Sequence, residues 1–239
     1  MKAIYKRELK SYFQSMIGYA FIAFMMVFVG IYFTAYNLNM GYPYFSYVLS
    51  STLFIFMIAV PVLTMKSFAE ERKSKTDQLL LTAPVSVTGI VLGKFLAMIT
   101  VFAIPVALSC VYPLVIKMQG TAYLKVDYAA ILVYFAIGCV YIAIGMFLSS
   151  LTESQIIAAV STFAVLLAFN MWSGLLGFLP DGTVGTWLKN FLGKLDFASL
   201  LSSLIDNSLL DISGLMLCIS LVFLFVFLTI QTIQKRRWS

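Results

Sequence analysis

The sequence contains no histidine, only three cysteines, and charged residues at 11% of its positions. The absence of histidine removes the commonest metal ligand and the commonest general base near neutral pH. The three cysteines, Cys110, Cys139 and Cys218, all lie within aliphatic runs. An odd number of cysteines in such surroundings argues against both a disulfide framework and a metal site.

Nucleotide-binding and catalytic motifs are also missing. Two Gly-Lys pairs are present, but they are followed by Phe95 and Leu195, so neither completes the G-x-x-x-x-G-K-[ST] loop that holds ATP phosphates. The sequence has no H-E-x-x-H and no G-x-S-x-G. The apolar runs carry no midplane carboxylate of the kind that proton relays use. We therefore expect no catalytic residue, cofactor or metal in this chain, and any energy for transport must come from another polypeptide.

Apolar residues are abundant and gathered into long runs. The chain has 239 residues and is 62% hydrophobic, whereas soluble domains are about half apolar and about a quarter charged. A membrane-spanning helix needs about 20 mostly apolar residues, and the chain has room for six. The composition therefore predicts one all-α integral membrane domain over residues 1–239, without a second soluble domain.

The hydropathy pattern divides this domain into six parts. They are an amphipathic interfacial helix at 1–15, spans 1 and 2 within 16–66, a polar stretch at 67–93, spans 3 to 5 within 94–176, a pair of amphipathic or re-entrant helices at 177–211, and span 6 with a basic tail at 212–239. A signal peptide is the alternative for the N-terminus. It is disfavoured because the apolar run after residue 15 is long and no A-x-A-like site follows promptly.

Prolines and glycines predict the shape of the spans. Pro61 is expected to kink span 2, and Pro105 and Pro113 to bend span 3. Gly138 and Gly145 lie one heptad apart in span 4, which would let another helix approach closely. The charged residues Lys66, Lys94, Lys117 and Glu153 are expected at span ends, and 117–127 is expected to be a loop that includes Lys125 and Asp127.

Basic residues predict the orientation. Of the 16 lysines and arginines, four lie within residues 1–15, five within 66–94 and three after residue 234. The positive-inside rule then places both termini and the 67–93 stretch in the cytoplasm. The formal charge of +6 therefore indicates topology and contact with lipid headgroups, and nucleic acid is not an expected partner.

The polar stretch at 67–93 contains five charged residues within positions 70–75, followed by an apolar turn, Leu79-Leu80-Leu81, that Pro84 ends. A short helix with charges of both signs and an apolar ridge suits docking to another protein. The alternative is a solvated loop that only satisfies the positive-inside rule.

This stretch resembles a motif of ABC type 2 exporter permeases, E-R…G-T…Q-L-L…T-x-P…G-K, which follows their second span. The matching residues here are Glu70-Glu71-Arg72, Thr76-Asp77-Gln78-Leu79-Leu80-Leu81-Thr82-Ala83-Pro84 and Gly93-Lys94. Within that family the chain looks most like the gliding-motility and nitrous-oxide-accessory branch. It departs from the pattern at Lys75, where the family often has glycine.

The resemblance implies a pair of permeases, identical or different, above two cytoplasmic ATPases that bind ATP and magnesium. An extracytoplasmic auxiliary protein is a further candidate partner. The resemblance also implies an exporter of the bacterial cytoplasmic membrane with a coupling helix at 70–84. The coupling residues it points to are Glu70, Glu71, Arg72, Thr76, Asp77, Gln78, Leu79, Leu80 and Pro84.

Six further residues are weaker candidates. Glu153 is either a second coupling contact or an ordinary interfacial charge. Phe54, Phe56, Phe163, Asn170 and Trp172 are candidates for a substrate path or gate, or else simply pack helices. Two other functions stay open, a channel or secondary transporter that works alone and a membrane anchor or immunity-type protein that transports nothing.

Overall fold

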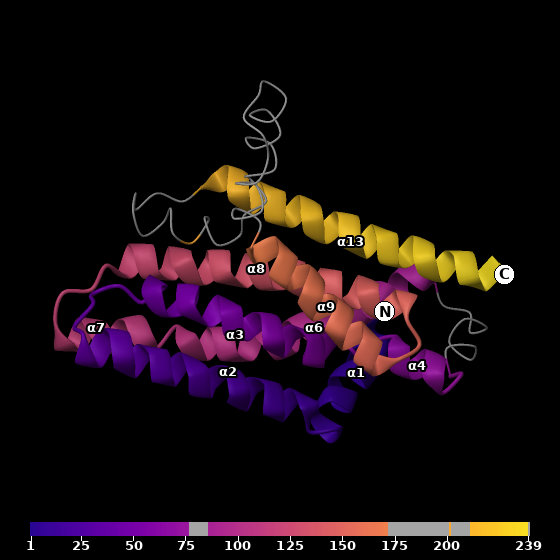
Figure 1. Cartoon of the computed structure of the whole chain (residues 1–239), viewed down its shortest axis with the longest axis horizontal. Helices are drawn as coiled ribbons and strands as arrows, with labels where there is room; N and C mark the ends of the chain where they lie inside the picture. Colours follow the sequence, from indigo (N-terminus) through magenta and orange to yellow (C-terminus); the bar gives the residue numbers. More distant parts are fainter. Residues whose placement is uncertain (77–85, 172–200, 202–210, 239) are drawn as a thin grey trace.

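The computed structural model describes residues 1–76, 86–171, 201 and 211–238, and the regular structure within these residues is entirely helical (Figure 1). The elements are α1 (Lys2–Gln14), α2 (Ile17–Phe33), the π-helix η1 (Thr34–Asn39), α3 (Ser46–Thr64), α4 (Ala69–Lys73), α6 (Val87–Ser109), α7 (Tyr112–Gln119), α8 (Leu124–Leu151), α9 (Gln155–Asn170) and α13 (Ile212–Trp238).

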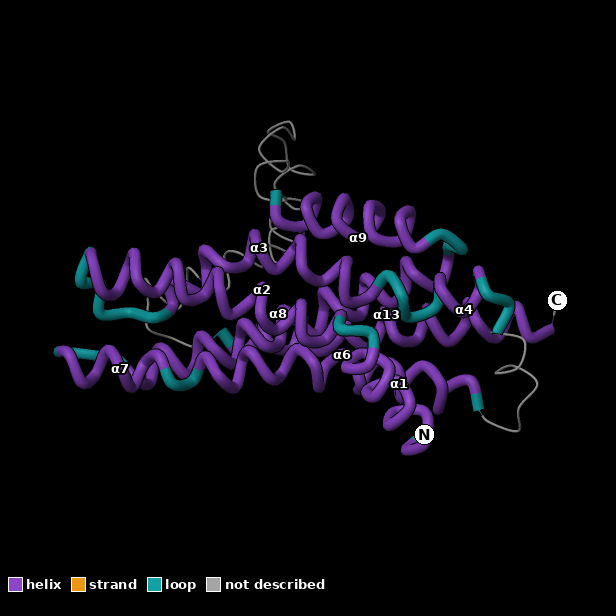
Figure 2. Tube along the Cα trace, turned by 90° about the horizontal axis from the view of Figure 1, so that it is seen from below, coloured by secondary structure: helices purple, strands orange, loops and turns teal. Residues whose placement is uncertain are grey.

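The long helices lie along one axis, and the two ends of the bundle differ. Helix α4 and both chain termini lie at one end, and α7 lies at the other (Figure 1). We call these the α4 end and the α7 end. Helix α1, the predicted N-terminal helix, lies at an angle to the long helices near the α4 end (Figure 2).

Five helical segments of the described chain are long and apolar enough to cross a membrane: Ile17–Asn39, Ser46–Lys73, Val87–Met118, Leu124–Leu151 and Ile212–Arg236. The predicted fifth span, about 156–176, contains α9, whose 16 residues are shorter than these segments. Most of the predicted helical pair at 177–211 lies outside the described residues. A multi-pass helical membrane domain is thus present, and six complete spans stay a prediction.

Two predicted boundaries were wrong. Helix α6 begins at Val87 because the Ser86 hydroxyl accepts the N–H of Gly89 at 3.3 Å and caps the helix. The polar stretch therefore ends before residue 87, and Lys94 lies two turns inside the helix instead of at its end. Helix α8 begins at Leu124, so Asp127, predicted in a loop, belongs to the first turn of α8 and is buried.

Two prolines lie inside continuous helices, and a third marks the start of a new helix. Helix α3 runs through Pro61, and α6 runs through Pro105 before it ends at Ser109. Helix α7 starts again with Pro113 in its first turn, where a missing N–H removes no helical hydrogen bond. The bend predicted for span 3 is therefore a break between α6 and α7.

The core is centred on α8, which packs against α3, α6 and α13. A Cβ atom added to Gly138 would overlap the Phe102 ring of α6, and one added to Gly145 would overlap the Thr64 side chain of α3. The predicted close approach of helices at these two glycines is confirmed. Phe56 of α3 also packs against α8 at Gly138, and its ring lies 4.7 Å from that of Phe102.

Candidate functional site

The predicted coupling region begins with α4, a helix of five residues at the α4 end of the bundle. Glu70 and Glu71 lie in its first turn, and Arg72 and Lys73 in its last turn, an arrangement that complements the helix dipole. A helix this short is not stable in isolation. Contacts with neighbouring elements must therefore hold it.

The strongest of these contacts is made by Lys94 of α6, whose side chain is 2% exposed. Its Nζ lies 2.9 Å from Glu71 of α4 and 3.3 Å from Glu8 of α1. It also donates a hydrogen bond of 2.7 Å to the carbonyl of Ser67, and lies 5.0 Å from the centre of the Phe68 ring. An unpaired ammonium group is costly to bury, and here its three donors have three oxygen partners.

Arg7 of α1 completes a network of four charges. Its guanidinium donates to Glu8 at 2.6 Å and to Glu71 at 2.9 Å. Burial lowers the pKa of Arg7, but the hydrogen bonds and charges of the two carboxylates outweigh this and raise it. The four side chains Arg7, Glu8, Glu71 and Lys94, which we call the charge network, join α1, α4 and α6.

Two tyrosines fix α1 in the position that the network needs. Tyr12 is buried and donates to the carbonyl of Leu63 in α3 at 3.2 Å. Burial, together with the nearby carboxylates, raises the pKa of Tyr12, so its hydroxyl stays protonated and remains a donor. Tyr5 shares a 3.0 Å hydrogen bond with Thr100 of α6. Both contacts tie α1 to the spans instead of leaving it free on a membrane surface.

The other side of α4 is tied to the link between α8 and α9. Arg72 donates to Glu153 at 2.8 Å, and the Glu153 side chain is otherwise exposed. Arg236 of α13 donates to the carbonyl of Ser150 at 2.6 Å and brings the C-terminal helix to the same place. Glu153, predicted as a second contact, therefore lies beside the first part of the predicted coupling region.

The end of α4 explains the departure at Lys75. The N–H of Thr76 bonds to the carbonyl of Glu71 at 2.9 Å, and the N–H of Lys75 bonds to that of Arg72 at 3.1 Å. This pair of bonds is a Schellman motif, in which the residue at the position of Lys75 is left-handed and usually glycine. Lys75 has φ 56°. Lys75 thus adopts the left-handed conformation that glycine usually provides at this position of the turn.

A polar cavity of about 370 Å³ lies between α1 and α4 beside the charge network. It is lined by Arg7, Glu8, Ser11, Tyr12, Ser15, Lys66, Glu70, Glu71, Ser74, Thr76 and Lys94. Within the described parts of the chain, no three acidic or sulfur side chains lie close enough together to hold a metal ion. The charged groups of the network are paired with one another. This arrangement suits the binding of a partner and the transfer of force more than the making and breaking of covalent bonds.

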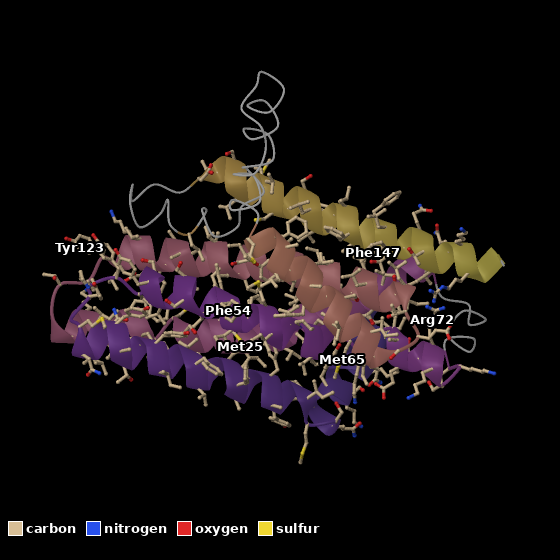
Figure 3. All side chains as sticks on the ribbon, in the orientation of Figure 1. Met25, Phe54, Met65, Arg72, Tyr123 and Phe147 are labelled. Atoms are coloured by element: carbon tan, nitrogen blue, oxygen red, sulfur yellow. The ribbon has the colours of Figure 1, made fainter. Side chains whose placement is uncertain are left out.

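The other predicted residues are not brought together. Phe56 is buried in the core, whereas Phe54 is 51% exposed on the outside of α3 (Figure 3). Phe163 and Asn170 are half-buried on α9. The predicted residues Asp77, Gln78, Leu79, Leu80, Pro84 and Trp172 lie outside the described part of the chain.

Sequence reasoning did not place Arg7, Glu8 or Lys94 in the site, although Lys94 ends the motif that resembles the family's. Lys94 interrupts an otherwise apolar run, and Glu8 is the one acidic residue in the basic N-terminal helix. Each residue is unusual in its own segment and opposite to the other in charge. Their pairing could have been suspected on that ground.

Comparisons with known proteins identify the family of the chain. A search of curated proteins found no match. The family described as ABC-2 family transporter protein matches residues 2–230, nearly the whole chain. Its members are the membrane components of ATP-driven transporters and are not themselves catalytic. With five segments among its described residues long and apolar enough to cross a membrane, the chain belongs to the ABC-2 transporter family as a multi-pass permease component.

Proposed function

We propose that this permease exports its substrate when a separate cytoplasmic ATPase binds at α4 and the residues that follow it and changes conformation. The change would displace α4. A second permease, identical or different, would complete the substrate path. ATP and magnesium would be bound by the ATPase. The observation that carries the proposal is that α4 is exposed on one side and ion-paired to three other parts of the chain on the other.

The exposed side of α4 includes Glu70 and Lys73, and the exposed turn after it includes Lys75 and Thr76. A partner protein could contact these residues without disturbing the bundle. The inward side carries Glu71 and Arg72, whose ion pairs reach α1, α6 and the α8–α9 link. A displacement of α4 would therefore be passed to several helices at once.

We further propose that the α4 end faces the cytoplasm and that the chain is in a bacterial cytoplasmic membrane. Lysines and arginines support this orientation, because the segments at the α4 end carry Lys2, Lys6, Arg7 and Lys10 while the α7 end carries Lys117 and Lys125. Both termini would then be cytoplasmic, and α1 would contact lipid headgroups. The narrower resemblance to the gliding-motility and nitrous-oxide-accessory branch and an extracytoplasmic partner are parts of the same proposal.

The test is purification of the tagged protein from its host in mild detergent, followed by mass spectrometry of the proteins that stay bound. We expect an ATPase with a phosphate-binding loop in stoichiometric amount. Glu70→Lys, on the exposed side of α4, should release it and leave the yield of folded permease unchanged. Lys117→Glu, a charge reversal of the same size and opposite sign at the α7 end, is the control and should keep the ATPase bound.

Two results would contradict the proposal. One is a permease that purifies without any nucleotide-binding partner. The other is a Glu70→Lys variant that binds the ATPase and exports as well as the wild type. Either result would favour an anchor or a channel.

A further inference from the structure

The helix is interrupted between α3 and α4, at residues 65–68. This interruption leaves backbone N–H and C=O groups without their usual helical partners. Ser149 of α8, which is fully buried, accepts the N–H groups of Phe68 and Ala69, both at 3.2 Å. The same hydroxyl donates to the carbonyl of Met65 at 3.2 Å. One side chain of α8 thus holds both sides of the break.

The opposite end of α3 is held in a similar way. Asp127 is fully buried in the first turn of α8, and its Oδ1 accepts the N–H of Phe45 at 2.8 Å. Phe45 immediately precedes α3, which begins at Ser46. This contact caps the N-terminus of α3, and Asp127 also lies in the first turn of its own helix. Its second oxygen, Oδ2, is buried without a hydrogen-bond partner in the described structure.

Between these two points the helices touch closely. Gly145 of α8 faces the Thr64 side chain of α3, and Gly138 faces Phe56 of α3 with an added Cβ only 3.1 Å from its ring. Asp127 and Ser149 lie about 33 Å apart along an ideal helix with a rise of about 1.5 Å per residue. That distance is close to the thickness of the hydrocarbon core of a bilayer, about 30 Å.

A contrasting boundary lies on the opposite side of α3. There Phe21 and Phe24 of α2 face Ile58 and Val62 of α3 across an apolar hollow of about 190 Å³. Apolar surfaces can slide because dispersion contacts are individually weak and not directional. Hydrogen bonds in a low-dielectric interior are directional, and leaving them unmade is costly.

We propose that Ser149 and Asp127 are positioning residues that make α3, α4 and α8 a single rigid unit. A displacement of α4 then reaches the α7 end of the bundle without being absorbed by bending at residues 65–68. This inference rests on the proposed function for its biological meaning, because the unit needs a partner that moves α4. Its mechanical content can be tested on the permease alone.

The test uses pairs of spin labels on full-length protein in lipid nanodiscs, with the native cysteines replaced. One pair, at the exposed residues Lys73 of α4 and Leu132 of α8, measures how much the distance between α4 and α8 varies. A second pair, at Leu132 and Leu151, lies within α8 and sets the width expected of a single helix. In the wild type we expect the two distance distributions to be equally narrow.

Ser149→Ala should widen the Lys73–Leu132 distribution at least twofold, and Ser149→Thr, which keeps a hydroxyl, should restore it. Asp127→Ala should widen the distribution of a third pair, Tyr42–Leu132, whereas Asp127→Asn keeps an acceptor and should not. Ser161→Ala is the matched control, since the Ser161 hydroxyl bonds to a carbonyl of its own helix at 3.1 Å. A broad wild-type distribution, or a Ser149→Ala distribution as narrow as the wild type, would overturn the inference.

Addition of ATP and vanadate extends the test to function, in a complex whose ATPase is shown to stay bound in stoichiometric amount after Lys73, on the proposed docking side of α4, is labelled. In the vanadate-trapped state the wild-type Lys73–Leu132 distance should stay constant and the Ser149→Ala distance should shift. ATP hydrolysis, measured separately without vanadate, should be the same in both. A shift in the wild type would show that the junction bends and would reject the rigid unit. If no ATPase copurifies, the proposed function fails, and the widths measured without nucleotide still decide on the unit.

Discussion

The two ends of the bundle are held together by different kinds of interaction. At the α4 end, the charge network and the Arg72–Glu153 pair join segments that are far apart in sequence. At the α7 end, aromatic rings do the same work, with Tyr44 stacked on Tyr123 at 4.7 Å and Phe45 stacked on Tyr112 at 5.4 Å. Tyrosines are typical of a membrane–water interface, where a polar tip and an apolar ring are both accommodated.

The difference teaches where the chain can respond to a partner. Ion pairs at a bundle end can be rearranged by another charged protein, because their strength depends on the surrounding charges and on water. Stacked rings hold their position mainly through buried area and shape. The predictions below test this contrast with variants whose controls lie at the other end or on the same helix.

The largest effect is expected at the centre of the charge network. Lys94→Met would leave the half-buried Glu8 and Glu71 with a single positive partner and would remove the donor to Ser67. Breaking one partner out of a buried ion pair typically costs about 3–5 kcal/mol. We expect a loss of about 3 kcal/mol in the free energy of unfolding, measured in mixed micelles.

The control for this variant is Lys66→Met. Lys66 lies 3.8 Å from Glu70 in a pair whose carboxylate is about half exposed, and exposed pairs contribute about 0–1 kcal/mol. Equal losses in the two lysine variants would contradict the role of the network.

The next largest loss of stability is expected at the centre of the bundle, between its two ends, where α8 contacts both α3 and α6. Gly138→Ala would push a methyl group into the Phe102 ring, and overpacking a core costs about 1–3 kcal/mol. Gly30→Ala in α2 has its nearest atom at 4.0 Å and should be neutral or stabilising by up to about 1 kcal/mol. Similar thermal stability in the two variants would argue against a tightly packed centre.

At the α7 end a smaller loss is expected. Tyr123→Ala removes the ring stacked on Tyr44, and aromatic pairs contribute about 0.5–1.5 kcal/mol beyond the area that they bury. The expected drop in unfolding free energy is therefore about 1 kcal/mol. Met118→Ala, at a side chain that is 88% exposed, should change stability less. If Tyr123→Ala lowered the free energy of unfolding as much as Lys94→Met does, the two ends would not differ in the way described here.

The smallest expected effect is a gain at the end of α4. Lys75 has a left-handed backbone conformation in the turn that ends α4, and this conformation is strained for a residue with a side chain. Lys75→Gly removes the strain, and we expect a stabilisation of about 1 kcal/mol or less. Lys73→Gly, two residues earlier and within the helix, should instead destabilise by about 1 kcal/mol. Hydrogen exchange of the α4 amides would measure both changes.

Much of the fold could be predicted from hydropathy, because long apolar runs leave the chain few alternatives in a bilayer. The close approach at Gly138 and Gly145 was predictable for a similar reason, since small residues one heptad apart face one direction. Lys94 and Asp127 could not be placed this way. A single charge near the end of an apolar run looks solvated unless its partner is known, and Glu8 lies 86 residues before Lys94 in the chain.

The candidate site was predictable in its position and less so in its geometry. A coupling helix was predicted at 70–84, but the helix that the structure has there, Ala69–Lys73, ends at Lys73, and residues 77–84 lie outside the described part of the chain. The motif did not indicate that Glu71 and Arg72 point in two directions, toward α6 and toward the α8–α9 link. Such directions depend on where the spans pack, which a local pattern does not encode.

The charge network also sets an order for membrane insertion. Glu8 and Glu71 are synthesised before Lys94, so both acids can wait at the water-exposed surface, where an ionised carboxylate is stable. Lys94 then arrives on a flexible four-carbon chain that can reach toward water while α6 enters the bilayer. The lysine becomes buried only after it meets both acids. A ribosome-bound chain that ends before α6 would therefore join α1 and α4 only through the Arg7–Glu71 pair, and the emergence of Lys94 would tie both of them to α6.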